Sequence, residues 1–244
     1  MLVAADGSNS AIRQQTGIDI ERVDYHQRAL VASLKLADHH RQIAWQKFLA
    51  DGPVALLPLA EGYCSLVWST TVEHAETLES LPLEAFNQEL SEALDAKPAV
   101  VTWSSPRRSF PLFRQLALRY AGHRTVLIGD AAHRIHPLAG MGANLGIADA
   151  LALTELLANH TDDPGGQAIT RRYDRQRRAE ANRYIAAQEL LRHCYRWNGR
   201  SASLVRGMGM GLLDRSQLLK PELLAYAMGL TDHQPPFFRG ERCS

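Results

Sequence analysis

The stretch from residue 124 to residue 157 constrains the fold of this 244-residue chain more than any other part. Thr125 to Ile128 is a short run of β-branched and aliphatic residues, typical of a strand that is buried on both faces, and it ends at Gly129-Asp130. Ligands of open α/β sheets bind at the carboxyl ends of the strands. An aspartate at that position is well placed to accept hydrogen bonds from the hydroxyls of a sugar or sugar alcohol.

A pair of glycines, Gly140 and Gly142, precedes apolar residues that recur at helical spacing from Leu145 onward. The spacing predicts a helix that begins near residues 140–142. Glycines at a helix entry allow a flat ligand to approach the backbone, and the free N–H groups there favour negative charge. An ordinary strand, turn and core helix explains Gly129-Asp130 taken alone, but the combined motifs favour a ligand site.

These residues resemble the second FAD-binding motif of the class A flavoprotein aromatic hydroxylases, in the run from Gly129 to His133, in Pro137 and in residues 140–146. The segments LAGMGANLGIADA, WQKFLADGPVALLPL and KPELLAYAMGL look most like the bacterial ubiquinone-biosynthesis FAD-dependent monooxygenases, and the similarity runs over nearly the whole chain. Met141 stands where the family most often has Gln, but the expected contact there is a backbone amide.

Residues 1–13 read as the end of a strand, a turn at Asp6-Gly7 and a helix capped by Ser8 or Ser10. In the class A hydroxylases a matching Asp-Gly motif serves both the flavin and the nicotinamide cofactor. The resemblance therefore implies that Asp6, Gly7 and Arg13 lie on the cofactor side. A plain capped turn is the alternative.

The resemblance implies FAD as the cofactor, with NAD(P)H as the electron donor. It places Asp130 at the ribityl hydroxyls, residues 140–144 at the pyrimidine edge and Asp6 on the pyrophosphate side. No acid–base pair or nucleophile is required, so no catalytic residue is assigned. The complete set of expected cofactor-binding residues is Asp6, Gly7, Arg13, Gly129, Asp130, His133, Pro137, Gly140, Met141, Gly142, Ala143 and Asn144.

The dinucleotide fingerprint G-x-G-x-x-G does not occur in the sequence. The resemblance implies that the amino-terminal strand, Gly-rich loop and helix of the family are missing, so we expect a carboxy-terminal part of a longer protein: a truncated chain, a gene remnant or half of a split protein. Without the phosphate-binding loop we expect this chain alone to bind FAD weakly or not at all.

The fold class expected is α/β (α+β), with a partial Rossmann-like FAD-binding domain in residues 1–21 and 112–200. Residues 22–111 contain short runs that read as strands at 29–36, 54–59, 63–70 and 100–103 and a helical pattern at 81–94. They predict an inserted, largely antiparallel sheet, which by resemblance binds the substrate. Residues 201–244 are expected to form a helical segment that packs on the body or offers a groove to a polyprenyl tail.

The resemblance implies hydroxylation of a polyprenyl phenol in ubiquinone biosynthesis. A non-catalytic subunit of a biosynthetic complex, a partner for a separate amino-terminal half and a different FAD-dependent oxidoreductase remain as alternatives. The formal charge of +1 offers no general attraction for nucleic acid, and three widely spaced cysteines fit a reducing compartment. We expect a cytoplasmic protein, with peripheral contact to the inner membrane as an option.

Several side chains carry weaker expectations. His133 and His136 do not predict a metal site, because neither a carboxylate nor a cysteine near them in sequence completes a ligand set. Arg107 and Arg108 lie where the family has a strand that crosses back to the flavin domain. Each is expected to be solvated, with contact to the cofactor or to a phenolate as the alternative. The arginines between Thr170 and Arg183 are expected to be solvated, with acidic phospholipid as the sharper alternative. The aromatic residues that are candidates for a substrate pocket, with the core as the more frequent role, are Trp45, Trp68, Trp103, Phe110 and Phe113.

Overall fold

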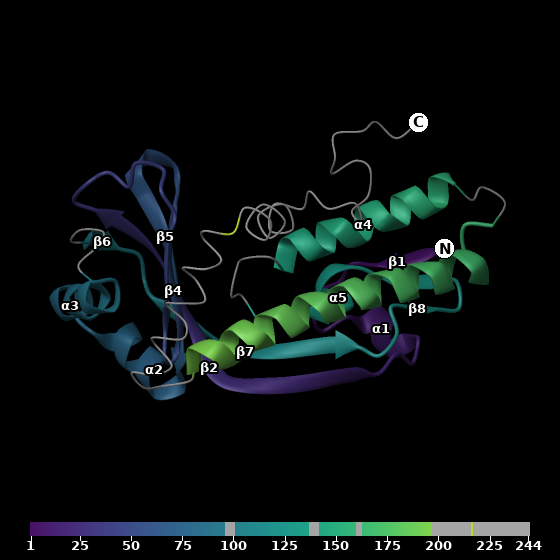
Figure 1. Cartoon of the computed structure of the whole chain (residues 1–244), viewed down its shortest axis with the longest axis horizontal. Coiled ribbons are helices and arrows are strands. Elements are labelled where there is room, and N and C mark those ends of the chain that lie inside the picture. The colour runs from purple at the N-terminus through teal and green to yellow at the C-terminus, as the bar shows by residue number, and fades with distance from the viewer. Residues whose placement is uncertain (96–100, 137–141, 160–162, 197–215, 217–244) are drawn as a thin grey trace. The chain divides into compact units, whose positions relative to one another are not determined.

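The computed structural model describes residues 1–95, 101–136, 142–159, 163–196 and 216 (Figure 1). The described chain forms two compact units. The first comprises the described residues of 1–23 and 114–191, and the second those of 24–113 and 192–196. The limits lie two residues from those expected at 21 and 111. The segment expected over 201–244 lies outside the described residues, apart from Ser216.

A three-stranded sheet organises the first unit, in the order β1 (Leu2–Ala4), β9 (Thr125–Leu127) and β8 (Ala121–Gly122). Strands β1 and β9 are parallel, with Leu2 opposite Thr125 and Ala4 opposite Leu127. Strand β8 runs antiparallel to β9. Because β1 and β9 are parallel and in register, both end at the same edge of the sheet.

Two long helices, α4 (Gly142–Ala158) and α5 (Gln167–Arg196), run alongside this small sheet (Figure 1). The Tyr173 hydroxyl on α5 donates to the Leu127 carbonyl at 2.8 Å, which joins that helix to β9. Short elements complete the unit: α1 (Ala11–Gln15), the 3-10 turn η2 (Gly129–Ala131) and β10 (His133–Arg134). The apolar core includes Ala4, Tyr120, Val126, Leu127, Leu145, Leu153, Leu156 and Ile169.

The strands of the second sheet follow the order β10-β7-β2-β5-β4-β3, with β6 paired to β2. The pairs whose register is defined, including β2 with β5 and β4 with β5, are antiparallel. The mixed architecture confirms the expected fold class. The strands are β2 (Ile20–Leu36), β3 (Trp45–Leu49), β4 (Gly52–Pro58), β5 (Tyr63–Thr71), β6 (Val101–Ser104) and β7 (Arg108–Ala117), with a 3-10 turn, η1, at Ala60–Gly62.

Helices α2 (Val72–Ser80) and α3 (Leu83–Ala93) lie on one face of this sheet (Figure 1). They enclose an apolar core that includes Leu34, Leu66, Leu78 and Phe86. Helix α3 confirms the helical pattern predicted from residue 81. Strand β3 and helix α2 were not predicted.

The five candidate aromatic side chains divide between core and surface. Trp68 is buried in the core of the second unit at 2% exposure, and Trp45 packs against that core. Phe113 is also buried. Trp103 and Phe110 stay exposed, at 47% and 53%, so these two alone of the five present a largely open ring.

Candidate functional site

The two motifs expected to bind the cofactor meet at the carboxyl edge of the β1–β9 pair. Asp6-Gly7 follows β1, and Gly129-Asp130 follows β9. The Ile128 N–H donates to the Ala4 carbonyl at 2.9 Å and continues the pairing to that edge. Segments that are far apart in sequence therefore contribute neighbouring turns to one ligand-facing edge.

The Asp6-Gly7 turn is a capped helix entry. Gly7 adopts φ 83°, which favours glycine, and Ser10 caps α1 by accepting from the Arg13 N–H at 3.0 Å. The Ser10 hydroxyl donates to the Asp6 carboxylate, and the Ile12 N–H donates to it at 3.2 Å. These hydrogen bonds, that of Ser10 foremost, hold the pKa of Asp6 below its usual value. Asp6 therefore has a local structural role whether or not it also approaches a ligand.

Arg13 braces the two turns against each other. Its guanidinium is buried and donates to the Ala131 carbonyl at 2.8 Å and to the Ser8 carbonyl at 2.8 Å. Burial lowers the pKa of Arg13, and the nearby Asp6 carboxylate opposes that effect. The Gln115 side chain also donates to the Ser8 carbonyl, at 2.6 Å. These contacts give Arg13 a positioning role at the edge.

A buried carboxylate, Asp149 on α4, holds the second turn. It accepts from the Gly129 N–H at 2.9 Å, and its same oxygen lies 2.6 Å from Nε2 of His133. Its other oxygen accepts from Nε of Arg177 at 2.7 Å. Asp149 and Arg177 are completely buried and His133 is 2% exposed. One carboxylate thus joins the turn, α4 and α5.

Arg177 on α5 corrects the expectation that the arginines of this helix are solvated. Its guanidinium also donates to Glu180 and, at 3.3 Å, to the Leu145 carbonyl. Burial alone lowers the pKa of Arg177, but the Asp149 and Glu180 carboxylates outweigh it and raise that pKa. Arg177 can be buried because its charge is paired with carboxylates and its N–H groups are hydrogen-bonded.

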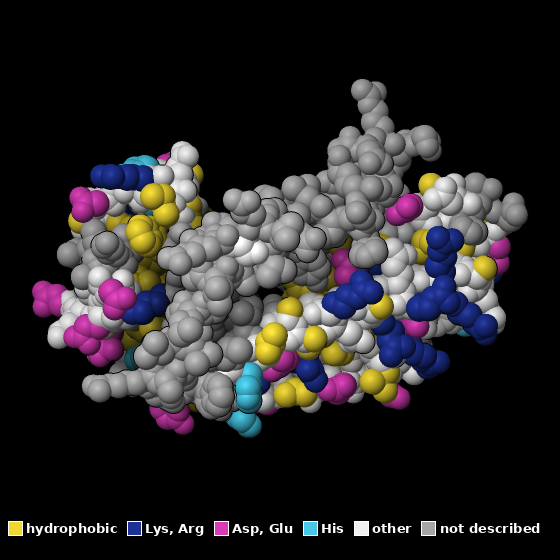
Figure 2. Space-filling view, in the orientation of Figure 1, with side chains coloured by type: hydrophobic (Ala, Val, Ile, Leu, Met, Phe, Trp, Pro, Cys, Tyr) yellow, Lys and Arg dark blue, Asp and Glu magenta, His cyan; other side chains and the backbone are white. Residues whose placement is uncertain are grey.

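The expectation of solvated arginines holds for other members of the same run. Figure 2 shows that Lys and Arg side chains gather over the face of the molecule that carries the first half of α5. The exposed arginines of that helix include Arg171, Arg172, Arg175 and Arg183.

Two glycines bring α4 against the turn. A Cβ added to Gly146 would lie 3.1 Å from the Cα of Gly129, which adopts φ 60°. Gly142, the first residue of α4, has open space around its would-be Cβ. Ala143 and Asn144 follow on the exposed side. The first N–H groups of a helix lack intrahelical acceptors, so the first turn of α4 carries donors that a ligand could use.

Asp130 differs from every other charged residue of the edge. It is exposed, and its carboxylate has no hydrogen-bonding or ionic partner among the described residues. It is therefore available to accept from ligand hydroxyls. His133 is buried against Asp149, so it supports the turn from the protein interior and is not exposed to a ligand.

The arrangement fits the polar and flat parts of a flavin. Asp130 offers an acceptor without a partner, and the glycines leave the backbone accessible. The Asp149 hydrogen bond and the close Gly129–Gly146 contact hold this turn against α4. Pro137, Gly140 and Met141, which were also predicted to bind the cofactor, lie outside the described residues.

From the sequence, Asp149 was counted with the motifs of residues 124–157 but was not assigned to the cofactor site, and Arg177 was not singled out. A signal was present for Asp149, because it falls within the apolar helical repeat of Leu145, Ala148 and Ala152. An acid on the buried face of a helix requires a partner. Nothing in the local sequence distinguishes Arg177 from the neighbouring arginines.

The chain matches the family described as FAD binding domain over residues 1–188. It is similar to the ubiquinone hydroxylase UbiL of Rhodospirillum rubrum, with 35% identity over 98% of this chain and 57% of the relative. It is also similar to the mitochondrial ubiquinone biosynthesis monooxygenase COQ6 of Xenopus tropicalis, with 34% identity over 93% of this chain and 57% of the relative. The chain therefore spans less than two thirds of the length of these relatives.

A solved structure supports the fold. The p-nitrophenol 4-monooxygenase PnpA of Pseudomonas putida DLL-E4 superposes with a TM-score of 0.73 at 16% identity, over 93% of this chain and 58% of that one. The family match covers both turns of the edge and the helices that hold them, and the relatives confirm the resemblance to the ubiquinone branch. The chain belongs to the FAD-binding domain family, and within that family it is similar to ubiquinone-biosynthesis hydroxylases.

Proposed function

We propose that this chain supplies the flavin-contacting edge and the substrate-side sheet of an FAD-dependent monooxygenase that hydroxylates a polyprenyl phenol in ubiquinone biosynthesis. The observation that carries the proposal is Asp130, an exposed carboxylate without a partner among the described residues, on a turn whose backbone is fixed from behind by buried Asp149. The names of the relatives support the substrate class.

The residues of the edge divide the work of holding FAD. Asp130 accepts from the ribityl hydroxyls, and the N–H groups at the start of α4 face the pyrimidine ring, where a reduced flavin carries negative charge. Asp149 and Arg13 keep the two turns in position. Bound FAD supplies the oxygen-transfer chemistry, with electrons from NAD(P)H, and the protein orients it and excludes water.

A titration of the full chain with FAD tests the role of Asp130. We expect weak binding by the chain alone, and a further loss of about tenfold in Asp130→Ala, because a hydrogen bond to a charged acceptor contributes about 1.5 kcal/mol or more. Asp38→Ala removes an exposed carboxylate of the second unit and is the matched control. If Asp130→Ala binds FAD as tightly as the parent, the proposed contact is wrong.

A complementation experiment tests the activity. The amino-terminal part of a relative such as UbiL is added in trans, and NAD(P)H oxidation and the products of a polyprenyl phenol are measured. Substrate-dependent oxidation with a hydroxylated product supports the monooxygenase. Oxidation without a hydroxylated product indicates a different FAD-dependent oxidoreductase.

The second candidate is a non-catalytic subunit that works by association. The observation that favours it is strand β1, which pairs only with β9 among the described strands and leaves Leu2 and Val3 exposed at 49% and 40%. Apolar edge strands of this kind accept further strands. Stable assembly with the added amino-terminal part, without any NAD(P)H oxidation, would support this candidate.

Peripheral binding to the inner membrane belongs to the same proposal. Within the described ranges, no helix has both the length and the apolar character needed to cross a bilayer. The exposed arginines of α5 offer a basic face for acidic phospholipid (Figure 2). Co-sedimentation with vesicles containing an anionic phospholipid, compared with neutral vesicles, tests this contact, and equal recovery in both would contradict it.

A further inference from the structure

The first unit contains a cavity of about 470 Å³ between the β8–β9 hairpin and the beginning of α5. Residues between 119 and 124 line one side of this cavity, and residues between 163 and 174 line the other. Figure 1 shows β8 beside α5. A cavity of this volume holds a small organic molecule.

Both carboxylates in the wall of the cavity are paired with arginines. Asp163 accepts from both terminal nitrogens of Arg124, at 2.8 and 3.0 Å. These hydrogen bonds are the main reason that the pKa of Asp163 lies below its usual value. Asp174 accepts from the Tyr120 N–H at 2.5 Å, and its other oxygen lies 3.6 Å from Arg178. Each aspartate stays charged, but each has its own guanidinium.

Arg119 and Arg171 are the two guanidiniums of the cavity without a carboxylate. Both are exposed, and neither side chain has a hydrogen-bonding or ionic partner among the described residues. Arg119 directly precedes Tyr120, whose N–H is bonded to Asp174, and Arg171 precedes Asp174 by about one helical turn. The two arginines therefore approach the cavity from different elements near the same point of α5.

The face of α5 beside this cavity is basic (Figure 2). The two acids of residues 171–183 turn toward the protein, since Asp174 accepts from the Tyr120 N–H and Glu180 from the buried Arg177. The remaining arginines recur on adjacent stripes of the helix, with exposed or half-exposed side chains. They are Arg171, Arg172, Arg175, Arg178 and Arg183.

The charge of the cavity stays positive when every carboxylate is counted as ionised. Three arginines, Arg119, Arg124 and Arg171, stand against the two aspartates in the wall, which leaves one positive charge in surplus. The neighbouring arginines of α5 add to the same potential. The cavity therefore favours an anion over a cation.

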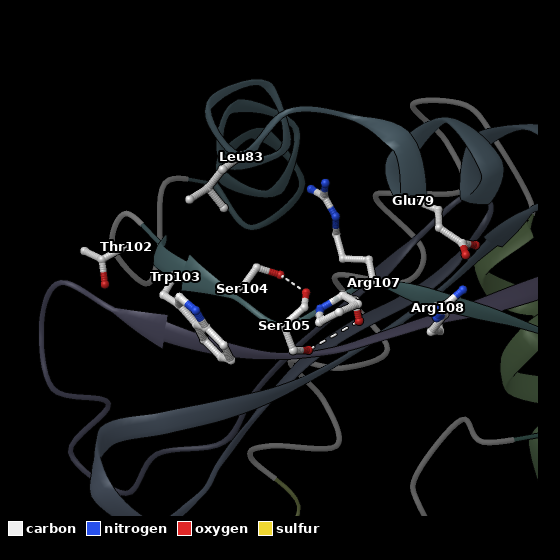
Figure 3. A pocket seen from close by; sticks show the side chains of 9 residues that line it. Glu79, Leu83, Thr102, Trp103, Ser104, Ser105, Arg107 and Arg108 are labelled. Carbon is white, nitrogen blue, oxygen red and sulfur yellow. Dashed lines mark hydrogen bonds between the residues drawn. The ribbon is translucent and has the colours of Figure 1, made fainter.

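The cavity of the second unit, about 600 Å³ in volume, lacks this character (Figure 3). Arg107 lies over the Phe86 ring and donates to the Leu81 carbonyl, and Figure 3 shows it extending toward the helices. Arg108 lies at the end that Glu79 occupies. A single anion there would meet one guanidinium and one carboxylate.

We propose that the cavity between the β8–β9 hairpin and α5 binds a phosphate ester, with the phosphate between Arg119 and Arg171. Guanidiniums match the geometry of phosphate oxygens. The volume also accommodates the organic group that carries the phosphate. A phospholipid headgroup and a soluble phosphate ester present the same chemistry to this site. The lipid case rests on the membrane contact proposed above, whereas the soluble case does not.

Calorimetric titration of the full chain with sn-glycerol 3-phosphate tests the proposal. A ligand of this size in an open site is expected to bind with a Kd of about 1 mM. Uncharged glycerol should bind at least about tenfold more weakly, because it cannot pair with either guanidinium. Equal affinity for the two compounds, or no binding of the phosphate at about 10 mM, would overturn the proposal.

Two exposed substitutions locate the site. Arg119→Gln and Arg171→Gln are each expected to weaken sn-glycerol 3-phosphate binding about fivefold. The matched controls are Arg175→Gln, on the same helix but outside the wall, and Arg108→Gln in the second unit. Both should leave the affinity nearly unchanged. Parental affinity in both test variants would refute the site.

A third substitution, Asp163→Asn, tests the sign of the selection. It releases Arg124 and removes a negative charge from the wall, so sn-glycerol 3-phosphate should bind about threefold more tightly. The amide oxygen of Asn can still accept from the Gly165 N–H, as Asp163 does at 3.2 Å. Thermal unfolding checks that the variant is folded. Unchanged or weaker binding would contradict an anion site.

Co-sedimentation with phosphatidylcholine vesicles, with and without phosphatidic acid, distinguishes the two sources of the phosphate. Arg119→Gln/Arg171→Gln is compared with Arg172→Gln/Arg175→Gln, which has the same net charge. A larger loss of vesicle binding in the first double variant assigns the site to a lipid headgroup. Equal losses, together with impaired binding of sn-glycerol 3-phosphate, assign it to a soluble ester. FAD titrations of these variants should match the parent, so failure of this site and failure of the flavin-contacting edge are distinguishable.

Discussion

The two units bury different kinds of side chain. In the first unit, Arg13, Asp149 and Arg177 are inside the protein, all within hydrogen-bond distance of the turns or helices that form the edge. In the described part of the second unit no Asp, Glu, Lys or Arg is buried, and the core around Leu34, Leu66 and Phe86 is apolar. The interior of the first unit therefore depends on specific hydrogen bonds between charged groups, as well as on apolar packing.

The two interiors stabilise the fold in different ways. Apolar burial has no preferred direction, so the core of the second unit stabilises the packing of the helices on the sheet without fixing individual partners. Charged hydrogen bonds have defined partners and angles, and removing one partner leaves the other unsatisfied. The buried charges of the first unit hold the two turns and the neighbouring helices in a defined arrangement.

The largest expected effect is that of Asp149→Ala. The substitution leaves the Arg177 charge buried without this partner and removes the acceptor of the Gly129 N–H, which should lower the free energy of unfolding by about 3–5 kcal/mol. Chemical denaturation measures the loss. Asp163→Ala, which breaks the exposed pair with Arg124, is the control and should leave the midpoint nearly unchanged. Equal denaturation midpoints for Asp149→Ala and Asp163→Ala would show that the buried charge contributes no more stability than the exposed pair.

The apolar interior is tested by Leu34→Ala, at a fully buried position of β2. We expect a loss of about 3 kcal/mol from the missing contacts and the cavity left behind. Hydrogen exchange should accelerate in the second sheet, while amides near Gly129 keep their protection. Leu57→Ala, at 40% exposure, serves as the mild comparison. Loss of protection at Gly129 in Leu34→Ala would show that the interiors are not independent.

A smaller effect is expected for Gly146→Ala. The new methyl group would lie 3.1 Å from the Cα of Gly129, so α4 or the turn must shift, at a cost of about 1–2 kcal/mol. Gly142→Ala adds the same group to the same helix in open space and is its control. Thermal unfolding measures the stability of both variants. A larger loss in Gly142→Ala than in Gly146→Ala would contradict the importance of the close contact between Gly146 and Gly129.

The smallest effect concerns Ser10 and the pKa of Asp6. Ser10→Ala removes the largest cause of the depressed pKa, which should move toward 3.8, and it removes a helix cap contributing about 1 kcal/mol. A depressed carboxyl pKa stabilises above the unfolded pKa, and this contribution is lost as the pH falls through the folded value. The variant should therefore lose less stability to acid. Carboxyl carbon chemical shifts followed by NMR give the pKa; Ser8→Ala should leave it unchanged.

The order of elements followed from the sequence because it depends on local patterns. The strand before Gly129-Asp130, the helix from Gly142 and the capped turn at Asp6 are visible as runs of apolar residues, glycines and a capping serine. Short strand β3 and helix α2 lack strong patterns and were missed. The partners of the edge could not be predicted, because Arg177 reaches Asp149 across 28 residues and looks like its solvated neighbours in sequence.

The hydrogen bond from Arg13 to the Ala131 carbonyl joins residues 118 positions apart, and the whole of residues 24–113 lies in the loop that it closes. Together with the β1–β9 ladder it ties both ends of that loop without relying on the peptide chain between them. A backbone cut by a protease at an exposed point of the inserted sheet would therefore leave the Asp6-Gly7 turn and the Gly129-Asp130 turn held together.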